Sequence, residues 1–267
     1  MSIRSLLKSI APLSLLDLVA GRKGRVFALG PPKSGTTSIA SIFREYCRAD
    51  HEAHRPRTVA EMYGHFTGEL SDADLMDTYR ARDKQLVLDV ESNCFLTYRP
   101  DLLTRTFPDS QFIIAVREPR AWLTSIVDNN INFPRDKNDV LTQWHRVFFG
   151  EPRQPGTAGD EPLLAQGLYP VATYLKYWTS TYDKCLRLVP EDRRMVVGTG
   201  QITARTAEML EFAGYSPKPA AVAASHKNRT KAKHEVLGSV DETHIDAMLE
   251  AHCAAFIERF RLAQLWR

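Results

Sequence analysis

The sequence lacks the features that mark disulfide-rich, zinc-binding or membrane-spanning proteins. Its 4 cysteines are scattered over 267 residues and form no C-x-x-C pair, so they suggest neither a disulfide framework nor a zinc site. Reduced thiols are instead typical of a cytoplasmic protein, which is the location we predict. The most apolar stretch, residues 6–20, is interrupted by Lys8, Pro12 and Asp17 and is too short to cross a bilayer.

The chain also lacks a strong excess of one charge. Lys and Arg number 35 against 32 Asp and Glu, which gives a net charge of +3. This small surplus predicts no nucleic-acid partner, although a local basic cluster could still hold a small anion. Hydrophobic residues at 43% and charged residues at 25% exclude disordered, collagen-like and coiled-coil proteins.

Residues 1–24 are predicted to form an N-terminal amphipathic helix. Leu6, Ile10 and Leu13 fall on one helical face, which favours docking on the protein's own body. Weak contact with a membrane surface is the second interpretation. A signal peptide fits less well, because the first expected strand begins at Val26, only a few residues after the small residues 19–21 at which cleavage would occur. The sequence gives no indication of the oligomeric state.

The remainder, residues 25–267, alternates apolar runs with helical segments. Strands are expected at residues 26–29, 85–90, 111–116 and 195–198. Helices are expected at residues 37–47, 71–82, 99–106, 120–129, 169–188, 204–213 and 241–265. This alternation predicts a single α/β domain with a central parallel sheet flanked by helices. Residues 131–167 are predicted to form a cap or substrate loop over the carboxyl edge of the sheet.

A loop rich in glycine and threonine joins the first strand to the first helix. Residues 30–37, with the sequence GPPKSGTT, place backbone amides at a helix N-terminus, where the helix dipole favours a phosphate. The glycine spacing fits the G-x-x-x-x-G of nucleotide P-loops, but Thr36 stands where that loop has its lysine. The lysine lies within the loop instead, as Lys33. A plain turn between strand and helix would not require this combination of residues.

This displaced lysine resembles the 5′-phosphosulfate loop of sulfotransferases that use 3′-phosphoadenosine-5′-phosphosulfate (PAPS). The resemblance implies a fold like that of the P-loop NTPases, PAPS as donor and 3′-phosphoadenosine-5′-phosphate (PAP) as product. It also implies that the loop binds the phosphosulfate through Lys33, Ser34, Gly35, Thr36, Thr37 and Ser38. Cytosolic members commonly carry Trp where Ser38 stands. Lys33 would meet the charge that develops on the leaving group.

A second segment is similar to the family's 3′-phosphate signature. Residues 112–119 run from an expected strand into Arg-x-Pro, and a helical serine follows eight residues after the arginine. The resemblance assigns Arg117 and Ser125 to the 3′-phosphate, for which a guanidinium offers a fork of donors. The alternative is that Arg117 pairs with a structural carboxylate.

A third, basic segment at residues 225–231 is similar in position and character to the late loop that closes over the nucleotide in this family. On that basis Asn228 and Arg229 are predicted to bind the donor. A solvated basic loop is the alternative.

Sulfuryl transfer also needs a general base for the proton of the acceptor. Several sulfotransferase branches place a catalytic glutamate after the first helix, where Glu52 is similar in placement. Glu91 follows the second expected strand, at a position comparable to the catalytic histidine of cytosolic members, but no Lys-x-His motif is present. We expect Glu52 first, then Glu91, and then His51 or His54.

The acceptor is less well specified than the donor. The resemblance leaves open a hydroxyl or amine on a small molecule, a carbohydrate or a lipid. Aromatic and histidine side chains in and after the expected cap form either core or substrate wall: Trp144, His145, Phe148, Phe149, Tyr169, Tyr174, Tyr177 and Trp178. No metal is expected to be required, because there is no polyphosphate for Mg²⁺ to mask.

Two other functions remain open on the sequence. A P-loop kinase or NTPase using Mg-ATP is one, because the apolar run 86–89 ends in Asp89, as a strand with a Mg²⁺-binding aspartate would. Thr36 in the lysine position counts against it. The other is a non-catalytic member that binds the nucleotide and acts through a partner.

Overall fold

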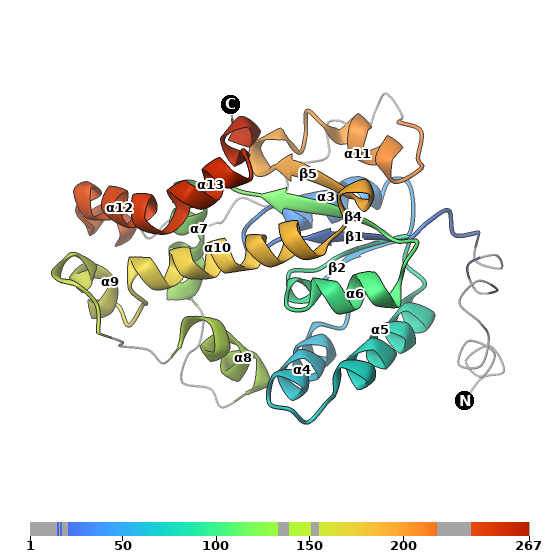
Figure 1. The fold of residues 1–267 in the computed structure, drawn as a ribbon, viewed down its shortest axis with the longest axis horizontal. Coiled ribbons are helices and arrows are strands. Elements are labelled where there is room, and N and C mark those ends of the chain that lie inside the picture. Colours follow the sequence, from blue (N-terminus) through green and yellow to red (C-terminus); the bar gives the residue numbers. More distant parts are fainter. Residues whose placement is uncertain are drawn as a thin grey trace.

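A computed structural model describes Leu15, Asp17 and residues 21–132, 139–150, 155–217 and 236–266. In these ranges 5 strands form one sheet in the order β2-β3-β1-β4-β5 (Figure 1). Every pairing is parallel. The strands are β1 (Val26–Leu29), β2 (Ala49–His51), β3 (Val90–Ser92), β4 (Gln111–Val116) and β5 (Arg194–Gly198). The predicted α/β domain with a central parallel sheet is confirmed.

Helices cover both faces of the sheet. They are α3 (Thr36–Phe43), α4 (Arg55–Phe66), α5 (Asp72–Leu86), α6 (Pro100–Thr106), α7 (Pro119–Ile131), α8 (Val140–Phe149), α9 (Glu161–Ala165), α10 (Val171–Leu188), α11 (Thr206–Phe212), α12 (Glu242–Leu249) and α13 (Ala255–Arg259). Strand side chains alternate between two cores. Val26 and Ala28 pack with α3 and α11, whereas Phe27 and Leu29 pack with α4 to α7 and α10. Figure 1 shows α10 running across the sheet, with α12 and α13 beside it.

Two of the expected elements end or break in places that the sequence did not indicate. The expected strand at 85–90 is wrong in its bounds, because α5 continues to Leu86 and β3 begins only at Val90. Val87 ends the helix in the left-handed conformation at φ 50°. A short apolar run is compatible with a buried helix end as well as with a strand. Val87 is buried at the end of α5, so its apolar character did not distinguish the two. The last helix is interrupted by a π-helical turn at Glu250–Ala254.

The edge strand β2 lies where the sequence suggested only a loop. It pairs with β3 so that His51 stands opposite Ser92. Its three residues include two polar side chains, Asp50 and His51, so no apolar run marked it. The strand places Glu52 directly at the carboxyl edge of the sheet.

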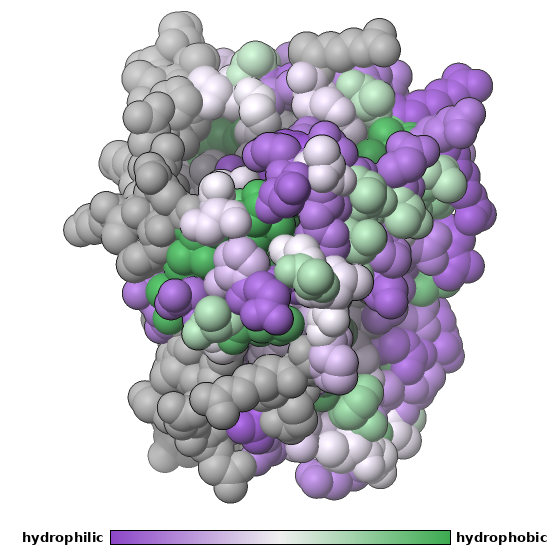
Figure 2. Space-filling model, turned by 90° about the vertical axis from the view of Figure 1, so that its left-hand side faces the viewer, coloured by the Kyte–Doolittle hydropathy of each residue, from purple (hydrophilic) through white to green (hydrophobic). Residues whose placement is uncertain are grey.

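Several expectations concern residues outside the described ranges. Most of the expected N-terminal helix and the whole basic stretch 225–231 belong there. The expected cap, 131–167, is described in part and contains α8 and α9. No helix in the described ranges is long and apolar enough to span a membrane. Figure 2 views the side toward which the strands' carboxyl ends point, where apolar residues lie recessed among polar ones.

The start of α5 offers a test of local stability. Ser71 Oγ accepts a hydrogen bond from the amide of Asp74, whose carboxylate accepts one from the Ser71 amide, so the two residues form a capping box. Ser71→Ala removes half of this capping box and should lower the melting temperature by about 2 °C. Ser71→Thr keeps the hydroxyl and serves as control. Equal melting temperatures for Ser71→Ala and wild type, measured by circular dichroism, would contradict the assignment.

Candidate active site

The loop between β1 and α3 has the form of an anion site. Gly35 begins α3 with φ 99°, and a Cβ there would lie 2.6 Å from Ile202 Cδ1, so only glycine fits. Lys33 also has a positive φ, 71°. No side chain caps α3, so the amides of Thr36 and Thr37 in its first turn stay available to an external anion, whereas the Ser38 amide donates to the Gly35 carbonyl.

Arg117 joins this loop from the end of β4. Its Nη1 donates a hydrogen bond of 2.9 Å to the carbonyl of Lys33. Its backbone is fixed on α10, because its amide donates to Tyr182 Oη at 3.1 Å and its carbonyl accepts from Trp178 Nε1 at 3.0 Å. No carboxylate in the described part of the chain forms an ion pair with Arg117, which counts against a structural role for its charge.

Lys33 and Arg117 are both partly desolvated cations. Burial, and then the Arg117 charge, lower the pKa of Lys33, while the carboxylate of Asp128 opposes the shift. Burial also lowers the pKa of Arg117. Two neighbouring cations that are costly to keep charged favour the binding of an anion beside them.

The other residues assigned to the donor occupy different surroundings. Ser34 is fully buried, and its Oγ lies against Gly30, where a Cβ would come within 2.3 Å. Ser38 is half-buried and its amide donates to the carbonyl of Gly35. Ser125 is half-buried on α7, one turn before Asn129, so the two share a helical face. Asn228 and Arg229 lie outside the described ranges.

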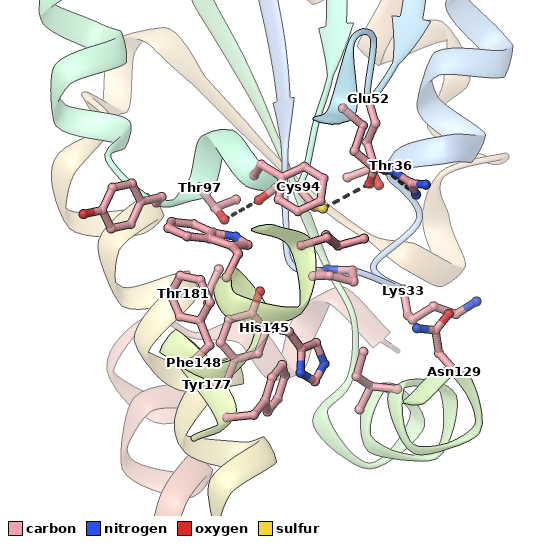
Figure 3. Close-up of a pocket in the computed structure, with 18 of the residues that line it drawn as sticks. Lys33, Thr36, Glu52, Cys94, Thr97, Asn129, His145, Phe148, Tyr177 and Thr181 are labelled. Carbon is pink, nitrogen blue, oxygen red and sulfur yellow. Dashed lines mark hydrogen bonds and ion pairs between the residues drawn. The ribbon is translucent and has the colours of Figure 1, made fainter. Parts of the chain in front are cut away.

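A cavity of about 320 Å³ opens beside the loop. Its walls come from the loop, the ends of β2 and β3, and helices α7, α8 and α10. They comprise Pro32, Lys33, Thr36, Thr37, His51, Glu52, Arg55, Cys94, Phe95, Thr97, Tyr98, Ile126, Asn129, Asn130, Leu141, Trp144, His145, Phe148, Phe149, Tyr177, Thr181 and Lys184. Figure 3 shows Lys33, Thr36 and Glu52 toward one end and Phe148, Tyr177 and Thr181 toward the other.

Glu52 is held in this wall by several contacts. Its carboxylate is 17% exposed and lies 3.7 Å from Arg55 Nη1 and 3.8 Å from His51 Nε2. The thiol of Cys94 donates to Glu52 Oε1 at 3.0 Å (Figure 3). Burial, and then the charge of Glu52, raise the pKa of Cys94 well above its usual range, so the sulfur stays protonated as a donor. The carboxylate is therefore oriented by a neutral hydrogen bond.

His51 connects this carboxylate to the loop. Its Nε2 lies 3.2 Å from both Thr36 Oγ1 and Thr37 Oγ1. Burial lowers the pKa of His51, although Glu52 opposes the shift, so the neutral imidazole is favoured and Nε2 can accept from the hydroxyls. His51 thus orients two loop side chains, whereas His54 is exposed and does not line the cavity.

Backbone strain is concentrated here. Lys33, Glu52 and His54 are three of the five non-glycine residues with positive φ in the described ranges. Such conformations persist where the surrounding structure fixes them, and they gather at functional sites.

A family model described as "Sulfotransferase domain" matches residues 25–232, well over half of the chain. The chain belongs to the sulfotransferase family. The family resemblance drawn from the loop and the Arg-x-Pro segment is confirmed. No curated protein matches the sequence.

Among solved structures, the chain is similar to the sulfotransferase domain from the curacin biosynthetic pathway, at 11% identity, 80% and 81% coverage of the two chains and a TM-score of 0.41. It is also similar to the sulfotransferase domain from the Synechococcus PCC 7002 olefin synthase, at 12% identity, 87% and 88% coverage and a TM-score of 0.44. A sulfotransferase from Alicyclobacillus acidocaldarius shares 13% identity over 86% and 95% of the chains, with a TM-score of 0.44. These scores are too low to carry further argument.

Glu91 has a structural place in this sulfotransferase. It is buried in β3, and its Oε1 accepts from Arg82 Nη2 at 2.6 Å and from Asn93 Nδ2 at 3.0 Å. Arg82 also donates to Thr58 and to the carbonyl of Ala53. Glu91 is not among the residues that line the cavity. This arrangement favours Glu52 as the base.

Asp89 does not support a kinase. It lies before β3, at the amino end of that strand, so it is at the sheet edge opposite the phosphate loop. Its Oδ2 accepts from Arg48 Nε at 2.8 Å. In parallel sheets ligands bind at the carboxyl ends of the strands. Asp89 precedes the amino end of β3, so it lies too far from the loop to bind a metal there.

The aromatic residues divide between wall and core. Trp144, His145, Phe148, Phe149 and Tyr177 line the cavity. The remaining three, Tyr169, Tyr174 and Trp178, are buried in the core. Sequence reasoning missed the polar wall residues Cys94, Thr97, Tyr98, Asn129, Asn130, Thr181 and Lys184. For α10 a signal existed, because Tyr177, Thr181 and Lys184 have the spacing of one helical face.

The buried pair of Arg82 and Glu91 predicts a loss of stability. Glu91→Ala leaves the guanidinium buried without its carboxylate and should lower the free energy of unfolding by about 3 kcal/mol, measured by urea denaturation. Adding Arg82→Met should recover part of that loss. Asp77→Ala, which breaks an exposed pair with Arg80 on α5, should cost no more than about 1 kcal/mol. A small effect of Glu91→Ala would reject the structural assignment.

Proposed function

We propose that this sulfotransferase takes the sulfuryl group from PAPS, transfers it to a hydroxyl or amine of a small-molecule, carbohydrate or lipid acceptor, and releases PAP. The observation that carries the proposal is that Lys33 lines the loop end of a cavity that has Glu52 in its wall, while a second partly desolvated cation, Arg117, is held against the same loop. A cation pair and a carboxylate so placed suit an anionic donor and a proton-bearing acceptor.

The donor groups in the structure fit the two anionic ends of PAPS. Lys33, the first-turn amides of α3 and the hydroxyls of Thr36 and Thr37 suit the phosphosulfate. Arg117 and Ser125 suit the 3′-phosphate, as the resemblance implies, and Asn228 and Arg229 stay predictions for the same end. When bound, PAPS supplies a sulfuryl group joined to its 5′-phosphate through an anhydride oxygen. We propose that side-chain cations, rather than a metal ion, offset its charge.

Glu52 acts as the general base in this scheme. One carboxylate oxygen takes the proton from the acceptor hydroxyl as the hydroxyl oxygen forms its bond to sulfur. The bond between sulfur and the anhydride oxygen of PAPS breaks at the same time, and PAP leaves with that oxygen. The Cys94 thiol fixes the carboxylate through Oε1. The Lys33 ammonium stabilises the negative charge that develops on the bridging oxygen of the leaving PAP. Its lowered pKa favours donation of a proton to that oxygen.

The same proposal places the enzyme in the cytoplasm with a small acceptor. All four cysteines are free, which suits a reducing compartment. The net charge of +3 supports a small ligand rather than nucleic acid.

Calorimetric titration tests the donor site. Wild type should bind PAP tightly with or without Mg²⁺ and bind ATP weakly. Lys33→Ala and Arg117→Ala should each weaken PAP binding about tenfold or more, because a charge-assisted contact is lost. Arg187→Ala, which breaks a surface pair with Asp183 on α10, is the matched control. ATP binding that depends on Mg²⁺ without preference for PAP would overturn the donor assignment.

Glu52→Gln tests the base. It should lower the rate of transfer from radiolabelled PAPS about a hundredfold or more across a panel of phenol, sugar and fatty-alcohol acceptors, because a proton acceptor is lost. PAP affinity should stay unchanged, since the amide keeps the shape of the side chain. Glu61→Gln controls for loss of a carboxylate elsewhere. Wild-type turnover in Glu52→Gln would exclude the role.

A further inference from the structure

The ammonium of Lys184 lines the cavity away from the loop between β1 and α3. It lies on α10 seven residues after Tyr177 and three after Thr181, which places all three on one face of the helix. All three line the cavity. Figure 3 shows Tyr177 and Thr181 on the side of the cavity away from Lys33 and Glu52.

The ammonium of Lys184 lies over two aromatic rings. Its Nζ lies 5.9 Å from the ring centres of both Tyr98 and Phe148. Trp144 packs edge-to-face on each of these rings at 4.9 Å, and Phe148 lies 5.2 Å from the ring of Tyr177. Ring faces hold a cation by their quadrupole but leave its hydrogen-bond donors unfilled. The cation is therefore positioned in an apolar wall and free to bind an acceptor group.

Asp101, the carboxylate whose charge reaches Lys184, is already paired with another cation. Arg99 pairs with Asp72 at 2.9 Å and with Asp101 at 2.8 Å. Burial lowers the pKa of Lys184 and the Arg99 charge adds to this shift, while Cys185 and Asp101 oppose it. Within the described ranges, no carboxylate forms an ion pair with Lys184. A half-buried ammonium of this kind favours an anion supplied from outside.

We infer that Lys184 binds a carboxylate on the acceptor, so that the enzyme sulfates hydroxylated acids whose body is apolar and ring-bearing. The inference rests on the proposed function, because it places the acceptor hydroxyl at Glu52. Charge enforces this orientation: the Glu52 carboxylate repels the acid end of the acceptor, and Lys184 attracts it. The segment from Cys94 to Tyr98 joins the two ends, since Cys94 contacts Glu52 and Tyr98 contacts Lys184.

The test compares phenolic acids with their methyl esters. The probes are 4-hydroxyphenylacetate, 3-(4-hydroxyphenyl)propionate and 4-(4-hydroxyphenyl)butyrate, each titrated calorimetrically into PAP-loaded protein and also assayed for transfer from PAPS. Wild type should bind at least one acid about tenfold more tightly than its ester, because a charge-assisted contact forms in a partly desolvated site. Added salt should weaken this preference only modestly.

Variants of α10 assign the preference to one side chain. Lys184→Met keeps the aliphatic stem over the rings and should remove the preference for the acid, leaving ester binding and PAP affinity unchanged. Lys184→Arg should retain it. Lys176→Met, at an exposed position of the same helix, removes an equal charge and should behave as wild type. Lys184→Gln provides a second neutral variant if Lys184→Met fails to fold.

The outcomes separate this inference from the proposed function. Equal affinity of wild type for every acid and its ester, or an unchanged preference in Lys184→Met, would overturn the role of Lys184 while PAP binding and transfer to the esters still stood. Loss of PAP binding and of all transfer in wild type would instead overturn the proposed function. An acid preference that depends on Lys184 would support the inference as a binding site in either case.

Discussion

Parallel pairing of the five strands is the constraint on which the site depends. Because β1 lies between β3 and β4, the phosphate loop that follows β1 has the end of β3 on one side and Arg117 on the other. The edge strand β2 then adds Glu52 beside β3. A hydrogen bond of 2.7 Å from Ser92 Oγ to the carbonyl of Thr36 ties the end of β3 to the start of α3. Residues from separate segments thus converge at one sheet edge.

The cavity is polarised along its length. Lys33 gives the loop end of the cavity a partly desolvated positive charge, and Arg117 is held against the same loop. Glu52 lies in the wall beside the loop, and aromatic rings form the wall near Lys184. The carboxylate of Glu52 lies between the cations Lys33 and Lys184, so a ligand that fills the cavity contacts charges of both signs. Such an arrangement selects an orientation as well as a shape.

The sequence located the features whose residues adjoin one another in the chain. It misplaced residues whose position depends on where a strand begins or ends. The loop and Arg117 were found because glycine, lysine and threonine adjoin a strand, and because Arg-x-Pro follows one. Asp89 was misplaced because β3 begins at Val90 and not at residue 85. With the expected bounds Asp89 would lie near the carboxyl end of the strand, whereas in the structure it precedes the amino end. Glu91 and Glu52 were both candidate bases on the sequence, because each was expected near the carboxyl edge of the sheet. In the structure Glu91 is paired with the buried Arg82 instead.

The sequence by itself determined the parallel α/β fold, the family and the conformation of the loop between β1 and α3, because apolar periodicity and a glycine that must adopt positive φ are local properties of the chain. Only the tertiary structure decided which carboxylate faces the cavity, that His51 meets the loop hydroxyls, and that Tyr98 and Phe148 enclose Lys184. Those outcomes depend on segments far apart in the chain. The residues that pack against a charged side chain decide whether it is buried with a partner or faces a cavity. Those residues are distant in the sequence, so the local sequence does not specify the outcome.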